Sequence, residues 1–171
     1  HSVPETRTTM DPRYALVVIT LVGSISKAQY WTPKTPFPDV VEASYSFTIE
    51  DRMFAGGGLN GVTPAVEYTG LNEYIASTNS WVPRAPLPVA RYGVGGFSIL
   101  GKGYVACGWH IGSPQLTDLW EYDPIGDSWT QKANFPGPGR YSTISVATTT
   151  KGYVGLGYSP YANDWWEYDP V

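Results

Sequence analysis

Histidine and cysteine are the scarcest of the side chains that could do chemistry in this 171-residue chain. His1 stands at the first position, and His110 is the only other histidine. A single internal histidine cannot build a multi-histidine metal site or a repeated acid-base pair. No Ser-His-Asp pattern is visible, and the single cysteine, Cys107, lies in an apolar stretch that suggests a small buried side chain. We therefore predict no catalytic residue, no metal site and no cofactor.

Arginine and aromatic side chains are better candidates for chemistry, and the chemistry they favour is binding. An Arg-Tyr pair stands at residues 91–92 and again at residues 140–141, and further aromatic residues lie in stretches rich in Gly, Ser and Pro. Arg, Tyr and Trp are frequent anchors at interfaces. Each has a plainer alternative, since a guanidinium can also bond the carbonyl groups of a turn and a loop aromatic can simply pack. The predicted ligand-binding residues are Arg91, Tyr92, Trp109, His110, Arg140, Tyr141, Tyr158 and Tyr161.

The elements that must position these residues are predicted to be short strands. Hydrophobic residues make up 42% of the chain and charged residues 15%, which favours a packed globular body. Seven Trp and thirteen Tyr suit pleated surfaces, while 19 Gly and 15 Pro separate them with turns. We expect no long helix. The formal net charge of -4, with scattered Lys and Arg, offers no basic surface to a phosphate backbone, so nucleic acid is not an expected partner.

An internal repeat organises the chain. Its clearest marks are the segments Trp31-Thr-Pro-Lys-Thr-Pro-Phe-Pro38, Trp81-Val-Pro-Arg-Ala-Pro-Leu-Pro88 and Trp129-Thr-Gln-Lys-Ala-Asn-Phe-Pro136, whose tryptophans are 50 and 48 residues apart. The second unit predicts four strands, within residues 93–100, 104–108, 118–124 and 128–133. Four strands of about 5 or 6 residues with their connections fill one blade of a β-propeller. The third unit repeats this pattern closely, whereas the first is degenerate, with Val41-Glu42 in place of Arg-Tyr.

These features resemble the kelch repeats of β-propellers, including those of secreted bacterial kelch-like proteins and the central propeller of the galactose oxidase type. The resemblance rests on a glycine-ended second strand, on the Tyr of Glu121-Tyr122-Asp123 and on the Trp that follows seven positions later. It implies an all-β, kelch-type β-propeller in which spaced Tyr and Trp pack between blades. The copper site of galactose oxidase has no counterpart, because it needs two histidines. The residues expected to carry the repeat architecture are Trp81, Gly108, Tyr122, Trp129, Gly157 and Tyr168.

The repeats account for about three four-stranded blades, in units of residues 29–80, 81–128 and 129–171. Propellers usually close with about 4 to 8 blades, so we expect an incomplete part of a larger propeller, of six or seven blades. The chain begins its repeats with an outermost strand near Trp31 and ends after a third strand at Val171. We expect the remaining blades to come from sequence outside this chain, with self-association of several copies as the alternative.

The N-terminal region is predicted to be a processing segment. Residues 1–9 read as an upstream extension and residues 10–28 as a secretory signal peptide, because Arg13 precedes an apolar run that ends in small residues near Ala28. The alternative is an apolar N-terminal strand. The run is shorter than the ~20 residues that a helix needs to cross a bilayer, so no membrane span is expected in the mature chain. We expect a secreted or extracytoplasmic protein.

Two sets of loops differ in length, and the longer set is the predicted binding face. Tight turns such as residues 50–52, 101–103 and 125–127 leave little room for a ligand. The connections at residues 58–64, 109–115 and 158–162, together with the inter-blade turns, are longer and richer in side chains that could contact a ligand. Binding is usually carried by loops on a rigid scaffold. The predicted function is a binding or scaffolding module for a protein or carbohydrate ligand. The alternative is a fragment of a carbohydrate-active oxidase, epimerase or hydrolase whose catalytic residues lie in missing blades.

Overall fold

The computed structural model describes residues 30–158 and 161–171, and the predicted extension and signal peptide lie outside these residues. The chain divides into two units, residues 1–33 and residues 34–171, and every strand described belongs to the second unit. No helix among the described residues is long and apolar enough to cross a membrane.

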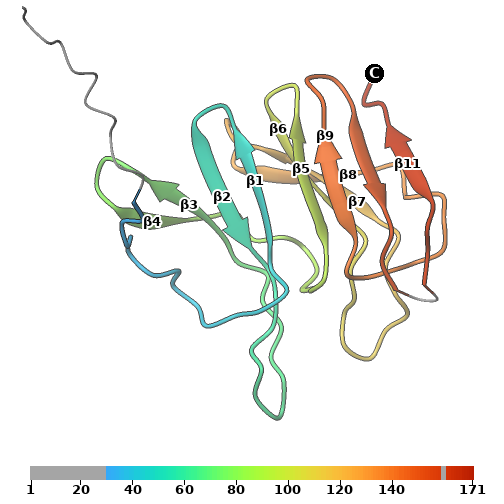
Figure 1. Ribbon diagram of the computed structural model, residues 1–171, viewed down its shortest axis with the longest axis horizontal. Helices are drawn as coiled ribbons and strands as arrows, with labels where there is room; N and C mark the ends of the chain where they lie inside the picture. Colours follow the sequence, from blue (N-terminus) through green and yellow to red (C-terminus); the bar gives the residue numbers. More distant parts are fainter. Residues whose placement is uncertain (1–29, 159–160) are drawn as a thin grey trace, which may run out of the picture. The chain divides into compact units, whose positions relative to one another are not determined.

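Three antiparallel sheets of four, four and three strands make up the fold (Figure 1). In each sheet, strands that follow one another in sequence are neighbours. We call the sheets blades 1, 2 and 3. Blade 1 contains β1 (Tyr45–Ile49), β2 (Arg52–Gly56), β3 (Leu71–Ile75) and β4 (Ser80–Arg84); blade 2 contains β5 (Gly95–Ile99), β6 (Lys102–Ala106), β7 (Leu119–Asp123) and β8 (Ser128–Lys132); blade 3 contains β9 (Ile144–Ala147), β10 (Gly152–Gly155) and β11 (Trp165–Tyr168).

The alternation of residue types explains the strands. In β1 the side chains of Tyr45, Phe47 and Ile49 are buried, while the two polar residues between them are exposed, as period-2 patterning requires. The hairpin from β5 to β6 turns through Leu100 and Gly101, whose φ angles are 49° and 75°. Positive φ at both central residues is typical of the tight turns that join twisted strands.

The blades pack face to face, with one hydrophobic core between blades 1 and 2 and another between blades 2 and 3. The first strand of blade 2, β5, contacts both β1 of blade 1 and β9 of blade 3, as Figure 1 shows. The approach is closest where a glycine of one blade meets a phenylalanine of the blade before it. A Cβ atom on Gly103 would overlap the ring of Phe47, and one on Gly152 would overlap the ring of Phe97. Glycine at these two positions therefore sets the spacing between blades.

The all-β prediction is confirmed, and the three sheets are consistent with blades of a β-propeller, although those of the described residues do not close one. The sequence units are offset from the sheets, since the boundaries at residues 80 and 128 fall at the first residues of β4 and β8. The strand predicted near Trp31 is not formed, because residues 30–44 contain only a bridge at Glu42. An outer strand needs a third strand beside it, and in blade 1 that place is taken by β4.

The predicted repeat residues occupy equivalent places. Trp81 and Trp129 lie in the fourth strands, directly opposite Tyr74 and Tyr122. The hydroxyl of Tyr122 donates to Asp127 at 2.8 Å. Gly108 and Gly157 follow second strands with φ angles of 98° and 99°, a region that favours glycine. In blade 3, Tyr168 packs on Tyr104 of blade 2, with ring centroids 5.5 Å apart.

Candidate functional site

Connections of two kinds emerge from opposite ends of the sheets. The hairpins between first and second strands are tight, whereas the connections from β2 to β3, from β6 to β7 and from one blade to the next are long (Figure 1). In blades 2 and 3 the inter-blade segment is fixed to the long loop of the same blade by one bridge, Tyr92 to Trp109 and Tyr141 to Tyr158. Each bridge is made of two backbone hydrogen bonds, of 3.0 and 3.0 Å in blade 2 and of 3.2 and 2.9 Å in blade 3. The backbone thus holds two aromatic pairs at the loop end.

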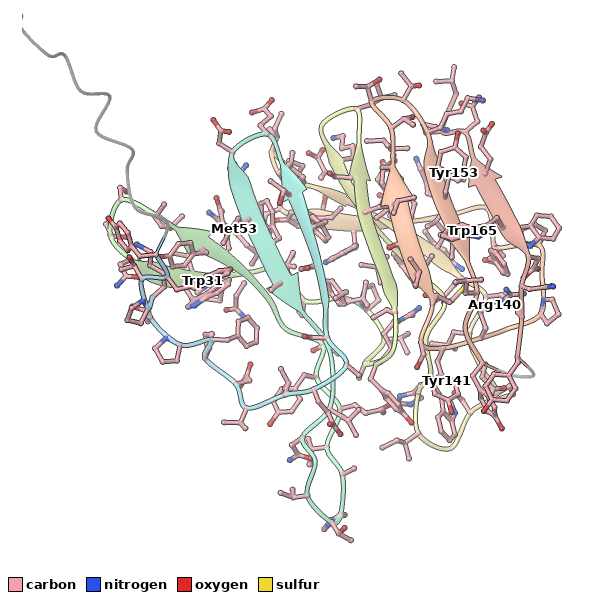
Figure 2. All side chains as sticks on the ribbon, in the orientation of Figure 1. Trp31, Met53, Arg140, Tyr141, Tyr153 and Trp165 are labelled. Atoms are coloured by element: carbon pink, nitrogen blue, oxygen red, sulfur yellow. The ribbon has the colours of Figure 1, made fainter. Side chains whose placement is uncertain are left out.

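The aromatic side chains at this end form one continuous row across blades 2 and 3. Ring centroids are 5.7 Å apart for Tyr92 and Trp109, 5.4 Å for Trp109 and Tyr141, 5.4 Å for Tyr141 and Tyr158, and 4.9 Å for Tyr158 and Tyr161. Such separations are those of favourable aromatic pairs. Figure 2 shows Tyr141 among the loops of this end. We call these five residues the aromatic row.

Exposure increases along the aromatic row. Tyr92, Trp109 and Tyr141 are half-buried, whereas Tyr158 is exposed and Tyr161 is 87% exposed. The Trp109 indole is held in place because its Nε1 donates to the carbonyl of Ser113 at 2.8 Å. Burial, together with the nearby Glu67 carboxylate and Tyr141, raises the pKa of Tyr92, so its phenol stays protonated and able to donate at neutral pH. The row therefore offers ring faces and hydroxyl groups at a partly exposed surface.

His110 lies beside the aromatic row and faces Glu67 from blade 1. Its Nδ1 lies 2.8 Å from Glu67 Oε2, which is within ion-pair distance. The two atoms do not have the geometry of a hydrogen bond. The other Glu67 oxygen accepts from the backbone N–H of Ile111 at 2.9 Å. Glu67 thus anchors the loop of the next blade. Sequence reasoning missed Glu67, because it lies in the degenerate first unit and has no counterpart in the repeat.

Arg91 is not at the surface, although it was among the predicted ligand contacts. Its side chain is 0% exposed and makes two bonds to the Asp118 carboxylate, of 2.6 and 2.7 Å. The same guanidinium donates to the carbonyl of Cys107 at 3.0 Å, and the Arg91 carbonyl accepts from Gly58 of blade 1 at 2.9 Å. Burial alone would raise the pKa of Asp118, but its bonds to Arg91 outweigh burial and lower it. Arg91 therefore has a structural role at the blade junction, as in the plainer alternative given above, and it is not part of the candidate site.

Arg140 repeats this arrangement in blade 3. It is buried and pairs with Asp164, and its carbonyl accepts from Gly108 of blade 2 at 2.8 Å. The guanidinium also lies over the ring of Phe135, with 4.8 Å to the centroid. Arg140 therefore also ties one blade to the next, and it too leaves the candidate site. The structure brings together the remaining six predicted residues: Tyr92, Trp109, His110, Tyr141, Tyr158 and Tyr161.

Groups that could bind a metal or act as nucleophiles are sparse in the part of the chain that the structure describes. No cluster of three or more His, Cys, Asp or Glu residues that could hold a metal ion occurs there. Cys107 is fully buried, and burial raises the pKa of its thiol to about 12, which keeps it protonated. A protonated, buried thiol is a poor nucleophile.

Comparison with known proteins agrees with the architecture. A scan against protein-family models and a search of curated proteins both give no match. Among solved structures, the chain is similar to one titled "Structure of YjhT", with a TM-score of 0.68 and 18% sequence identity over 86% of this chain and 57% of that one. This chain therefore spans just over half the length of that protein. At this identity the likeness concerns the fold alone.

Proposed function

We propose that the protein is an extracytoplasmic binding module of the kelch-like propeller type, which presents the aromatic row to a protein or carbohydrate ligand. The observation that carries the proposal is the continuity of the row. Its five rings come from four separate connections in two blades, and backbone bridges hold two of its pairs in place.

The chemistry of the row suits both ligand classes. Ring faces give apolar contact to the C–H face of a sugar or to aliphatic side chains, and the tyrosine hydroxyls supply hydrogen bonds. Tyr and Trp bring large contact area at little cost in side-chain entropy, which is why they dominate many paratopes. His110 adds a side chain that is partly exposed at the edge of the row.

Buried ion pairs hold the scaffold beneath the row, which favours recognition. The buried Arg91–Asp118 pair and the Arg140–Asp164 pair fix the two inter-blade segments that carry Tyr92 and Tyr141. A binding surface set on an ordered framework loses less entropy when its ligand arrives. We propose binding rather than catalysis because the row contributes contact groups and no pair of groups within it provides an acid and a base.

The test is binding of the full chain to a glycan array and to a protein-ligand array. Substitution of Tyr141→Ala together with Tyr158→Ala removes the middle and one exposed ring, and we expect at least a tenfold loss of affinity, about 1.4 kcal/mol or more. Ile125→Ala is the matched control. It removes an apolar side chain that is 93% exposed in the tight β7–β8 turn, away from the row. Wild-type chain that binds nothing on either array, or a double variant that binds as well as wild type, would refute the proposal.

A further inference from the structure

The rings of the aromatic row are turned against one another rather than laid in one plane. The ring of Tyr158 makes an angle of 70° with that of Tyr141 and of 80° with that of Tyr161. Both pairs are edge-to-face contacts, in which the edge of one ring meets the face of the next. Each contact leaves an apolar corner between the two rings, which we call a notch. A flat platform for stacked sugar rings would need coplanar ring faces instead.

The half-buried end of the row is a cluster of three rings. Tyr92, Trp109 and Tyr141 all contact one another, with ring centroids 5.4 to 6.1 Å apart and ring planes tilted by 33° to 61°. Exposure increases from this cluster toward Tyr158, which is 42% exposed, and Tyr161, which is 87% exposed. A ligand on the row therefore meets the two notches beside Tyr158 first and the cluster at their inner end.

The free polar groups of the row are tyrosine hydroxyls. In the repeat architecture, the hydroxyls of Tyr74 and Tyr122 donate to side chains of their own blades at 2.7 and 2.8 Å. Within residues 30–158 and 161–171, the hydroxyls of the row's four tyrosines have no hydrogen-bond partner. The Trp109 Nε1 already donates to the carbonyl of Ser113. The hydrogen bonds left for a ligand are thus those of phenol groups, each of which can donate one bond.

Three carboxylates at the loop end are engaged within the protein. Glu67 accepts from the backbone N–H of Ile111, and Asp118 and Asp164 pair with buried arginines. A sugar presents several hydroxyl donors, which carboxylate side chains accept most strongly. The row itself contains no carboxylate, and its tyrosines can donate. It is therefore better matched to a ligand with compact apolar groups and many acceptors.

A polyproline II segment has this complementary chemistry. It makes no internal hydrogen bonds, so its carbonyl groups remain free acceptors, and proline adds an apolar ring without an N–H group. The helix has three residues per turn and rises about 9 Å in each turn. Trp109 and Tyr158 are joined by two ring-to-ring steps of 5.4 Å, so they lie within about one such turn of each other. Prolines at positions i and i+3 can therefore meet successive notches.

We propose that the ligand of the aromatic row is a proline-rich segment of a protein, bound in the polyproline II conformation. The inference rests on the proposed binding function and names the ligand class of the same site. Prolines of the segment pack in the notches on either side of Tyr158, and hydroxyls of the row donate to its carbonyl groups. Such a segment is already extended before it binds, so it loses little chain entropy on an aromatic-lined surface.

The first experiment measures peptide binding to the full chain by fluorescence polarisation. The probes are labelled decaproline and a set of labelled twelve-residue peptides that each contain two Pro-x-x-Pro turns with varied x. The control for each peptide that binds is its mirror image made of D-residues, which has the same composition and the opposite helical hand. We expect the L-peptide to bind at least tenfold more tightly. Absence of binding by every L-peptide, or equal binding of the two hands, overturns the proposal.

The second experiment tests the notches with two variants of one residue. Tyr158→Ala removes the ring shared by both notches and should weaken binding of the best L-peptide at least tenfold. Tyr158→Phe keeps the ring, removes the hydroxyl and should give a smaller loss. Ile125→Ala, in the tight β7–β8 turn, should bind as wild type does. Tyr158 is exposed, so these changes leave the fold intact, which far-ultraviolet circular dichroism checks. Wild-type affinity in Tyr158→Ala, or an equal loss in Ile125→Ala, contradicts the proposal.

A glycan array run in parallel separates this inference from the proposed function. A chain that binds glycans through Tyr141 and Tyr158 but binds no proline peptide has the binding function and another ligand class, which overturns the inference alone. Binding to folded proteins that lack proline-rich segments has the same meaning. Displacement by unlabelled L-decaproline of a ligand found on the protein array supports the inference, whereas binding to none of these probes refutes both proposals.

Discussion

Removal of the buried guanidinium in Arg91→Met should be among the most destabilising single changes in this protein. The methionine keeps much of the apolar stem but leaves the Asp118 carboxylate, whose side chain is only 16% exposed, without its two charged bonds. The Cys107 carbonyl loses its donor as well. Removing one partner of a buried ion pair typically costs about 3 to 5 kcal/mol. We expect the free energy of unfolding to fall by an amount in that range.

The repeat supplies the control, because Arg140→Met removes the same side chain at the same position of blade 3. Its partner Asp164 is 38% exposed, so water can solvate the carboxylate that is left behind. The expected cost is about 1 to 2 kcal/mol, from the weaker pair and the lost bond to the Leu156 carbonyl. The difference between the two variants isolates the effect of burial, since residue type and position are matched.

The assay is equilibrium unfolding in urea, followed by tryptophan fluorescence and by far-ultraviolet circular dichroism. Coincident transitions are needed before free energies are compared, because repeat arrays can lose two-state behaviour. The reasoning is refuted if Arg91→Met costs less than about 1 kcal/mol, or if both variants cost the same. Either result would mean that the buried pair contributes no more than a surface pair.

Three further changes test other parts of the structure. Tyr122→Phe removes the hydroxyl that bonds Asp127 and should cost about 1 kcal/mol, measured by urea unfolding, with Tyr74→Phe giving a similar loss through Asn79. Gly103→Ala forces a methyl group into the Phe47 ring and should cost at least 2 kcal/mol in the same assay, in line with overpacking. The Arg140 bonds lower the pKa of Asp164 from 3.8 to about 2, so their stabilisation is present above pH 4 and is lost as pH falls toward 2. Urea midpoints measured across that range should fall less steeply for Asp164→Asn.

The sequence was informative about strands because each strand combines period-2 burial with a turn signal. Leu100-Gly101 and the glycine-ended second strands fix where β5 and β6 begin and end, and the recurring Trp marks the fourth strand. It was less informative about the arginines. The local sequence around Arg91 does not distinguish an arginine that faces a ligand from one that faces a buried carboxylate. Its partner Asp118 follows only after a long loop. Only the fold shows that the loop returns to place Asp118 against the guanidinium.

The aromatic row could be predicted in its members but not in its continuity. Tyr92, Trp109 and Tyr141 are in separate connections, and their contacts cross from blade 2 to blade 3. Those contacts depend on the spacing between blades, which is set by the close approach of Gly152 to Phe97. Glu67 was missed for a similar reason, since its contact with His110 crosses from blade 1 to blade 2. Relations between blades are the part of this fold that a repeat pattern does not contain.

Comparison of the repeats distinguishes features with a structural role, which recur from blade to blade, from features suited to ligand binding, which do not. The buried ion pair recurs in blades 2 and 3, and the inter-blade packing recurs in every junction, as expected of structural roles. The bridge that carries aromatic pairs in blades 2 and 3 is formed in blade 1 by Glu42 and Leu59. The aromatic pairs are therefore features of blades 2 and 3 and not of the repeat itself, which favours recognition over architecture as their role.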